Sequence, residues 1–266
     1  MAKSPNRKPS KIRPVPIDRM RVPPALVVQR EFRQAWADKL TAELDLNKLG
    51  YPIMNFRDGI YWVVDGQHRI AALKGNGFNT DNVDCEVYEN LADSEMADIF
   101  LGRDARKQIA PYDKFHVACT AQHKRELDIR RAVESNGQKI SRDRDEGVSC
   151  VGALGKVYDR SGDVVLGQVI RTINLGFGGD PLAFDRSVIE GLGLVYNRFN
   201  GRTNEKALGQ RLNNLKQGAR ELLRKAEALR ERTGNQKKHC VAAVVVEIYN
   251  KGEGPTNSKN RLPSWW

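Results

Sequence analysis

The sequence predicts an α+β protein in which a small α/β domain is followed by a mostly helical C-terminal domain. In the first 110 residues, β-branched and aromatic runs alternate with helix-periodic runs and turn glycines. After Pro111, apolar residues recur at three- and four-residue spacing almost to residue 250. No apolar run approaches the length of a membrane span, and no apolar segment follows the basic N-terminus, so we expect a cytoplasmic protein.

The first part of the chain is expected to hold a basic disordered arm at 1–14 and the α/β domain at 15–110. Asp58-Gly59 predicts a tight hairpin, because both residues tolerate positive φ. Phe32, Trp36 and Leu40 recur every four residues and predict an amphipathic helix. The predicted order is a strand at 15–18, a helix at 30–48, strands at 51–56 and 60–64, a helix at 68–74, a strand at 83–88 and a helix at 94–101.

The helical domain is predicted at 111–250 and a flexible tail at 251–266, where Trp265-Trp266 could dock on the body or on a partner. The pair 150–158 and 164–174 has the turn length of a helix-turn-helix, but its second helix is too apolar for a DNA groove, so both helices are expected in the core. The other helices are predicted at 111–134, 184–197, 204–215, 219–232 and 238–249.

The basic charge is concentrated in a few segments. The chain carries a net charge of +11, with an excess of Lys and Arg in residues 1–30, 198–238 and 251–266 and a net negative remainder. Such a layout suits contact with nucleic-acid phosphates. The four cysteines are far apart and are expected to be free thiols, and no confident metal site is predicted.

The most informative segment is Asp65-Gly66-Gln67-His68-Arg69, which joins a predicted strand to a predicted helix. The free N–H groups at a helix N-terminus favour an anion, and glycine lets a phosphate approach the backbone. Arg69 offers a planar fork and His68 a further donor, while Asp65 could cap the helix or hold a divalent ion. A capped helix with a surface Arg and His would look the same.

This motif, with Ala71-Ala72 after it and a glycine-turned hairpin before it, resembles the signature of the ParB/sulfiredoxin superfamily, especially ParB-like N-terminal domains of phages and mobile elements. The resemblance implies that Gly66, Gln67, His68 and Arg69 bind the phosphates of CTP or another NTP with Mg²⁺. Sulfiredoxins carry a cysteine where this chain has Gln67, so sulfiredoxin activity is not expected.

A second family box, usually Glu-Asn-x-x-Arg, aligns with residues 102–106. The resemblance implies that Arg103, Arg106 and Lys107 add phosphate contacts, although the same residues would also suit a solvated helix face. Gly102 and Arg103 replace the Glu and Asn of the family, so the resemblance implies nucleotide binding more firmly than hydrolysis. Asp65, His68 and Asp104 are the catalytic candidates.

Residues 198–238 are the DNA-binding candidate, because an apolar seam runs along one side and basic residues along the other. The predicted DNA contacts are Arg211, Lys216, Arg220, Arg224 and Lys225. We expect a ParB-like DNA-binding protein with a nucleotide site, and a homodimer is left open. The alternatives are a metal-dependent nuclease or phosphotransferase using acids such as Asp58 and Asp65, a weak NTPase, and a DNA-binding module that has lost its nucleotide.

Overall fold

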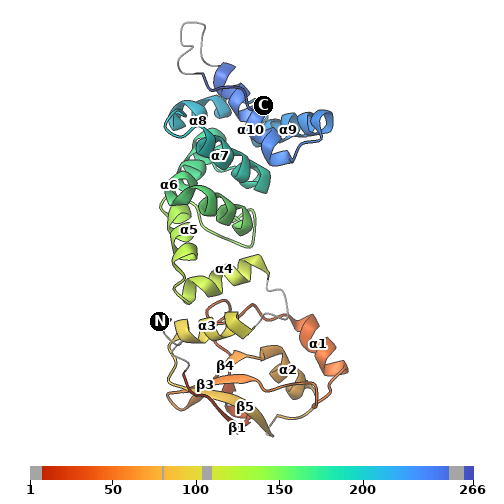
Figure 1. Cartoon of the computed structure of the whole chain (residues 1–266). Helices are drawn as coiled ribbons and strands as arrows, with labels where there is room; N and C mark the ends of the chain where they lie inside the picture. The colour runs from red at the N-terminus through yellow and green to blue at the C-terminus, as the bar shows by residue number, and fades with distance from the viewer. Residues whose placement is uncertain (1–7, 80, 104–109, 252–260) are drawn as a thin grey trace. The chain divides into compact units, whose positions relative to one another are not determined.

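The structure is a computed structural model that describes residues 8–79, 81–103, 110–251 and 261–266 (Figure 1). The chain divides into two compact units, Met1–Lys124 and Arg125–Trp266. The first holds a five-stranded sheet and the second is helical, which confirms the α+β class. Helix α4 (Pro111–Thr120) begins at the expected domain boundary and lies in the first unit, where it packs on α3 (Asp93–Arg103).

The sheet has the strand order β1-β5-β3-β4-β2. Its strands are β1 (Lys11–Pro16), β2 (Met20–Arg21), β3 (Ile53–Arg57), β4 (Ile60–Asp65) and β5 (Asn82–Glu89). Strand β1 is antiparallel to β5, β3 is antiparallel to β4, and the β3–β5 and β2–β4 pairs are parallel. Residues 11–14, expected in the disordered arm, therefore belong to an edge strand, where Pro14 and Pro16 are tolerated. Residues 1–7 lie outside the described part.

Two apolar cores cover the two faces of the sheet. Met54 and Val63 face one core with α2 (Gln67–Gly75), and their neighbours Ile53 and Val64 face the other with α3. This alternation follows from the two-residue period of a strand. Asp58 and Gly59 both have positive φ, at 54° and 77°, which confirms the predicted hairpin.

The helix predicted at 30–48 is much shorter, because α1 spans Gln34–Ala42. Arg33, which precedes it, is extended and gives no side-chain cap. Phe32 lies outside the helix and stacks on His68 with 4.9 Å between ring centroids. This contact with a residue far away in the sequence holds Phe32 outside the helix, although the four-residue spacing of Phe32, Trp36 and Leu40 predicts it inside.

The helix predicted at 111–134 is also divided. Helix α4 ends at Thr120, α5 (Lys124–Glu134) begins four residues later, and Gln122 between them has a φ of 62°. No proline or glycine marks this break in the sequence. A prediction from apolar periodicity alone therefore treats the two helices as one.

The second unit also contains α6 (Val151–Phe177), α7 (Arg186–Arg198), α8 (Glu205–Asn213), α9 (Gly218–Thr233) and α10 (Lys237–Lys251). Gly162, with φ 79° and ψ −178°, breaks α6 where the sequence predicts a turn. Leu166, Val169 and Ile173 after that break are fully buried, which confirms that this helix belongs to the core. Within the described residues, every helix is too short or too polar to cross a membrane.

The end of the tail is docked on the second unit. Trp265 is buried against Phe199, and Arg198 lies over its ring with 4.9 Å to the centroid. The Asn250 amide both donates to and accepts from the Leu262 backbone at 2.9 Å. Residues 261–266 therefore differ from the flexible tail that the composition predicts, and 252–260 lie outside the described residues.

Candidate functional site

Helix α2 starts at a glycine in the left-handed region. Gly66 has φ 110°, and it caps the nine-residue helix without a side-chain hydrogen bond. A Cβ at this position would lie 3.2 Å from the Arg69 guanidinium and from Pro52. Glycine is therefore required both by the backbone angle and by the space beside Arg69. The first N–H groups of the helix have no intrahelical acceptor, so this end favours a negative charge.

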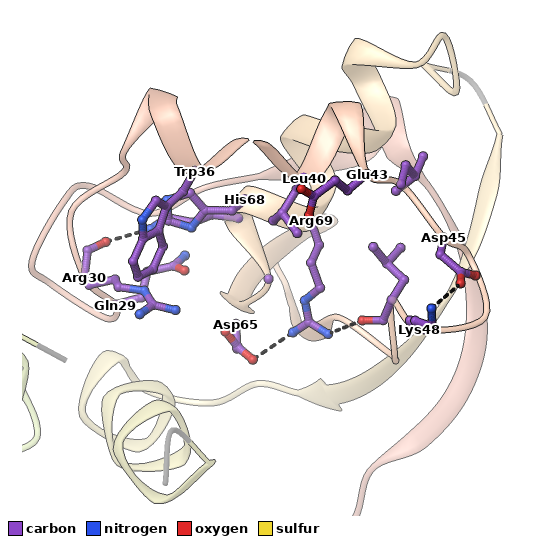
Figure 2. A pocket seen from close by; sticks show the side chains of 14 residues that line it. Gln29, Arg30, Trp36, Leu40, Glu43, Asp45, Lys48, Asp65, His68 and Arg69 are labelled. Atoms are coloured by element: carbon purple, nitrogen blue, oxygen red, sulfur yellow. Dashed lines mark hydrogen bonds and ion pairs between the residues drawn. The ribbon is translucent and has the colours of Figure 1, made fainter. Parts of the chain in front are cut away.

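Arg69 holds three segments of the domain together. Its Nη2 donates to Asp65 Oδ2 at 2.8 Å, and its Nη1 donates to the Leu49 carbonyl at 3.0 Å (Figure 2). The same Nη1 also donates to the Tyr51 carbonyl at 3.4 Å. The Arg69 side chain is 21% exposed and that of Asp65 is 30% exposed. Arg69 thus has a structural role beside the helix N-terminus in addition to its charge.

Gln67 and His68 anchor the loop before α1. The Gln67 amide donates to the Arg30 carbonyl at 2.7 Å, and the Arg33 N–H donates to His68 Nε2 at 3.0 Å. Because a backbone N–H can only donate, Nε2 of His68 is the unprotonated nitrogen here. Both residues are buried, and their expected roles as ligand contacts or catalytic groups stay predictions.

The motif opens onto a cleft of about 710 Å³ (Figure 2). Asp65, Gly66 and Arg69 line it together with residues from the loop before α1, from α1 and from the turn after it. Its charged residues balance in sign: Arg30, Lys48 and Arg69 face Glu43, Asp45 and Asp65. The Lys48 side chain is 85% exposed and pairs with Asp45 at 3.2 Å.

Sequence reasoning missed the far side of this cleft. Trp36 and Leu40 line it, although their spacing predicts only a buried helix face. The Arg30 guanidinium lies 5.0 Å from the Trp36 ring centroid, and Trp36 also tilts against His68. No local pattern marks Arg30 or Lys48 as site residues, because the tertiary packing of a loop and a turn brings them to the motif.

The described residues contain no group of three or more His, Cys, Asp or Glu side chains that could hold a metal ion. Asp58 lies in the hairpin turn before β4 and Asp65 is the last residue of β4, so the length of the strand separates them, roughly 20 Å at the rise of a strand. These two carboxylates therefore cannot share one metal. Asp104, Arg106 and Lys107 lie outside the described residues, and so does the Arg103 side chain.

The four cysteines are free thiols, as the sequence predicts. Burial, with a further contribution from Asp84, raises the pKa of the Cys85 thiol to about 12. This thiol lies in the core beneath α2 and is protonated at neutral pH. It therefore offers no reactive thiolate beside the motif.

The basic residues predicted to bind DNA do not share one hollow of the second unit. Arg211 is tied to α10, where it donates to the Tyr249 carbonyl and stacks over the Tyr249 ring at 4.5 Å. Arg211 and Lys225 line one hollow, and Arg220 lines another with Asp180. Lys216 and Arg224 are exposed. The apolar side is buried at Leu208 and Leu212 of α8 and at Leu222 and Ala226 of α9, but it is interrupted where α8 ends and α9 begins.

Several solved structures are similar to this chain, and three of them are ParB proteins. A C-terminally truncated chromosome-partitioning protein ParB from Caulobacter crescentus, complexed to the centromeric parS site, has 15% identity and a TM-score of 0.36, over 88% of this chain and 99% of that one. Two pNOB8-like ParB N-domain structures have 13% identity and TM-scores of 0.40, over 91% and 85% of this chain and 97% and 98% of theirs. Similarity at this level says nothing about what this chain does.

No curated protein matches the chain. A family model described as a family of unknown function matches residues 23–262, which include the residues that line the cleft and most of both units. The chain therefore belongs to the family DUF6551.

Proposed function

We propose that the cleft at the N-terminus of α2 binds the phosphates of a nucleoside triphosphate, with CTP as the first candidate and Mg²⁺ carried by the nucleotide, and that the protein also contacts DNA. One observation carries the nucleotide site. A glycine-capped helix N-terminus opens onto a cleft of about 710 Å³ that is lined by Arg30, Lys48 and Arg69. Backbone N–H groups and a nearby cation together are the usual donors to phosphate oxygens.

The cations of the cleft would have different roles. Arg69 is held by Asp65 and by two carbonyls, so it would contribute a fixed charge close to Gly66. Lys48 is exposed and paired with Asp45 near the surface, so it could turn from Asp45 to a phosphate at little cost. Trp36 and Arg30 offer a flat surface at the other side of the cleft, which suits a base.

The first experiment is a thermal-shift panel of nucleoside triphosphates and diphosphates, each with and without Mg²⁺ and DNA. We expect one triphosphate with Mg²⁺ to raise Tm and the Lys48→Gln variant to lose most of that rise. Lys39→Gln is the matched control, because Lys39 is an exposed lysine of α1 that does not line the cleft. No shift with any nucleotide, with DNA binding intact, would favour a DNA-binding module without a nucleotide.

Asp65→Asn separates two roles for this carboxylate. If Asp65 mainly neutralises Arg69, removing the Asp65 charge strengthens phosphate binding, because the positive charge of Arg69 is then no longer neutralised. If Asp65 holds Mg²⁺, the variant loses the Mg²⁺-dependent part of the affinity. Calorimetric titrations with and without Mg²⁺ distinguish these results, and the ion pair with Arg69 leads us to expect the first.

The proposal of DNA contact is supported by the excess of basic residues in 198–238. Arg220 and Arg224 are exposed and lie one turn apart on α9. Replacing both with Gln should lower the slope of log K against log salt by about 1.8 on duplex DNA, since each phosphate contact contributes about 0.9. An unchanged slope would remove α9 from the DNA-binding surface.

A further inference from the structure

Glu190 is a buried carboxylate that gathers three cations. Its side chain is 6% exposed, and its Oε1 accepts from Arg186 Nε at 2.9 Å and from Lys156 Nζ at 3.1 Å. Lys238 Nζ lies 3.6 Å from Oε2. Lys156 comes from α6, Arg186 and Glu190 from α7, and Lys238 from α10, so tertiary packing creates the group (Figure 1). We name these four residues the Glu190 cluster.

Close helix packing fixes the Glu190 cluster in place. A Cβ on Gly191, the next residue of α7, would lie 2.7 Å from Val241 of α10. The absence of a side chain there lets α7 and α10 approach, and this brings Lys238 to Glu190. The packing of α7 against α10 in the core therefore fixes the positions of the residues of the cluster.

The outer side of the Glu190 cluster is positive. Three cations surround one carboxylate, which leaves an excess of two positive charges. The carboxylate is ionised at neutral pH: burial raises the pKa of Glu190, but hydrogen bonds from Arg186 and Lys156 outweigh it and lower the pKa overall. Glu190 lies below the surface, whereas the Arg186 and Lys156 side chains are 65% and 48% exposed.

A neighbouring ion pair leaves this excess unchanged. Asp185, the N-cap of α7, lies 3.7 Å from Arg144 and so adds one charge of each sign. The exposed heads of Arg186 and Lys156 are thus held next to each other by a common anchor. Two fixed and incompletely neutralised cations are preorganised for an anion, since little side-chain freedom is left to lose on binding.

We propose that the Glu190 cluster binds two neighbouring backbone phosphates of duplex DNA, with Arg186 contacting one, Lys156 contacting the other and Lys238 supplying charge. This inference rests on the proposed DNA contact and adds Lys156 of α6 and Arg186 of α7 to the basic segment at 198–238, which already contains Lys238. Arg186 offers a planar fork to phosphate oxygens and Lys156 a point charge. Contacts of this kind fix the position of the protein on DNA without reading bases.

The test is fluorescence anisotropy with a labelled duplex of about two helical turns, measured over a salt series on the full chain. The double variant Arg186→Gln/Lys156→Gln should bind more weakly, and its slope of log K against log salt should be smaller by about 1.8. The double variant Arg186→Lys/Lys156→Arg keeps both charges and should keep the slope. Lys139→Gln, at an exposed lysine paired with Glu146, should match the wild type.

Single variants keep the test valid if the double Gln variant does not fold. Lys156→Gln leaves Arg186 on Glu190 and should reduce the slope by about 0.9. Excess inorganic phosphate at constant ionic strength should compete only weakly, because one free ion lacks the multiple contacts of a duplex. Full competition by phosphate would show a small-anion site and overturn the DNA assignment.

Failure of this inference differs from failure of the proposed function. If Arg220→Gln/Arg224→Gln lowers the slope and Lys156→Gln does not, the Glu190 cluster is not a DNA contact while DNA binding by the protein stands. If the wild type does not bind duplex DNA at any salt concentration, both are wrong. A slope lowered equally by Lys139→Gln also overturns the inference, because it would reflect overall charge alone.

Discussion

Replacing Arg69 with Ala tests how the geometry of the cleft is held, because Arg69 joins the end of β4, the turn after α1 and the start of α2. The change removes an ion pair to Asp65 at 2.8 Å and hydrogen bonds to the Leu49 and Tyr51 carbonyls at 3.0 and 3.4 Å. Leu49 and Tyr51 lie well before Asp65 and Arg69 in the sequence. We therefore expect Arg69→Ala to loosen the cleft as well as to remove a charge.

The size of the effect follows from these contacts. A hydrogen bond to a charged group contributes about 1.5–3 kcal/mol, and partial exposure of both side chains lowers the Asp65 pair to about 1 kcal/mol. The Leu49 bond adds about 1 kcal/mol, and the longer Tyr51 bond adds little. The total of about 2 kcal/mol corresponds to a fall in Tm of about 6–10 °C for a domain of this size.

Differential scanning calorimetry of the full chain measures this change in the transition of the first unit. Arg69→Lys keeps the charge but loses the fork, so it should recover about half of the loss. Lys74→Ala, at an exposed basic residue in the last turn of the same helix, is the control and should change Tm little. A fall of less than about 2 °C for Arg69→Ala, a small fraction of the shift expected for a domain of this size, would refute the structural role that the contacts indicate.

Gly66→Ala should destabilise the first unit by about 1–2 kcal/mol in urea unfolding, because φ is 110° and the new Cβ would crowd Arg69; an unchanged midpoint would contradict this. Trp265→Ala should cost the second unit about 3 kcal/mol, whereas Trp266→Ala should cost little, because the first ring is buried and the second is 55% exposed; equal effects would refute the docked tail. The net fall in the pKa of Glu190 makes its contribution to stability complete above the ordinary value of 4.5, and this contribution should be lost as pH falls through the lowered value. The free energy of unfolding should therefore depend less on pH below 4.5 in Glu190→Gln than in the wild type. Curves of identical shape would exclude the pairing of Glu190 with Arg186 and Lys156.

Local signals were enough for several elements. Asp58-Gly59 specifies its hairpin because two adjacent residues with positive φ leave few other choices. Gly66 marks the start of α2 for the same kind of reason, and the kink at Gly162 falls in the predicted turn. The apolar helix after that kink is buried because its side chains leave no polar face for a groove.

Other features depend on partners far away in the sequence. Strand β1 forms because Lys11 pairs opposite Val87, which no composition rule for a basic arm anticipates. The start of α1 is set by the stacking of Phe32 on His68. The docking of Trp265 similarly depends on Arg198 and Phe199, which lie far earlier in the chain.

The same distinction holds for the site. The residues of one segment, 65–69, can be recognised from the sequence because a strand, a glycine and a helix start lie in a row. Lys48 and Arg30 enter the cleft only through the folding of a loop and a turn. The Glu190 cluster is harder still to foresee, since its three cations lie on three helices.

Hydrogen exchange of the backbone amides, measured with and without the triphosphate and Mg²⁺ that give the largest thermal shift, tests the nucleotide site most directly. We predict added protection in peptides covering the start of α2, at Gln67, His68 and Arg69, and in the turn that carries Lys48. Peptides from the docked tail at 261–266 should exchange at unchanged rates. Protection that appears elsewhere while the start of α2 exchanges as before, or no response to any nucleotide, would contradict the proposed nucleotide site.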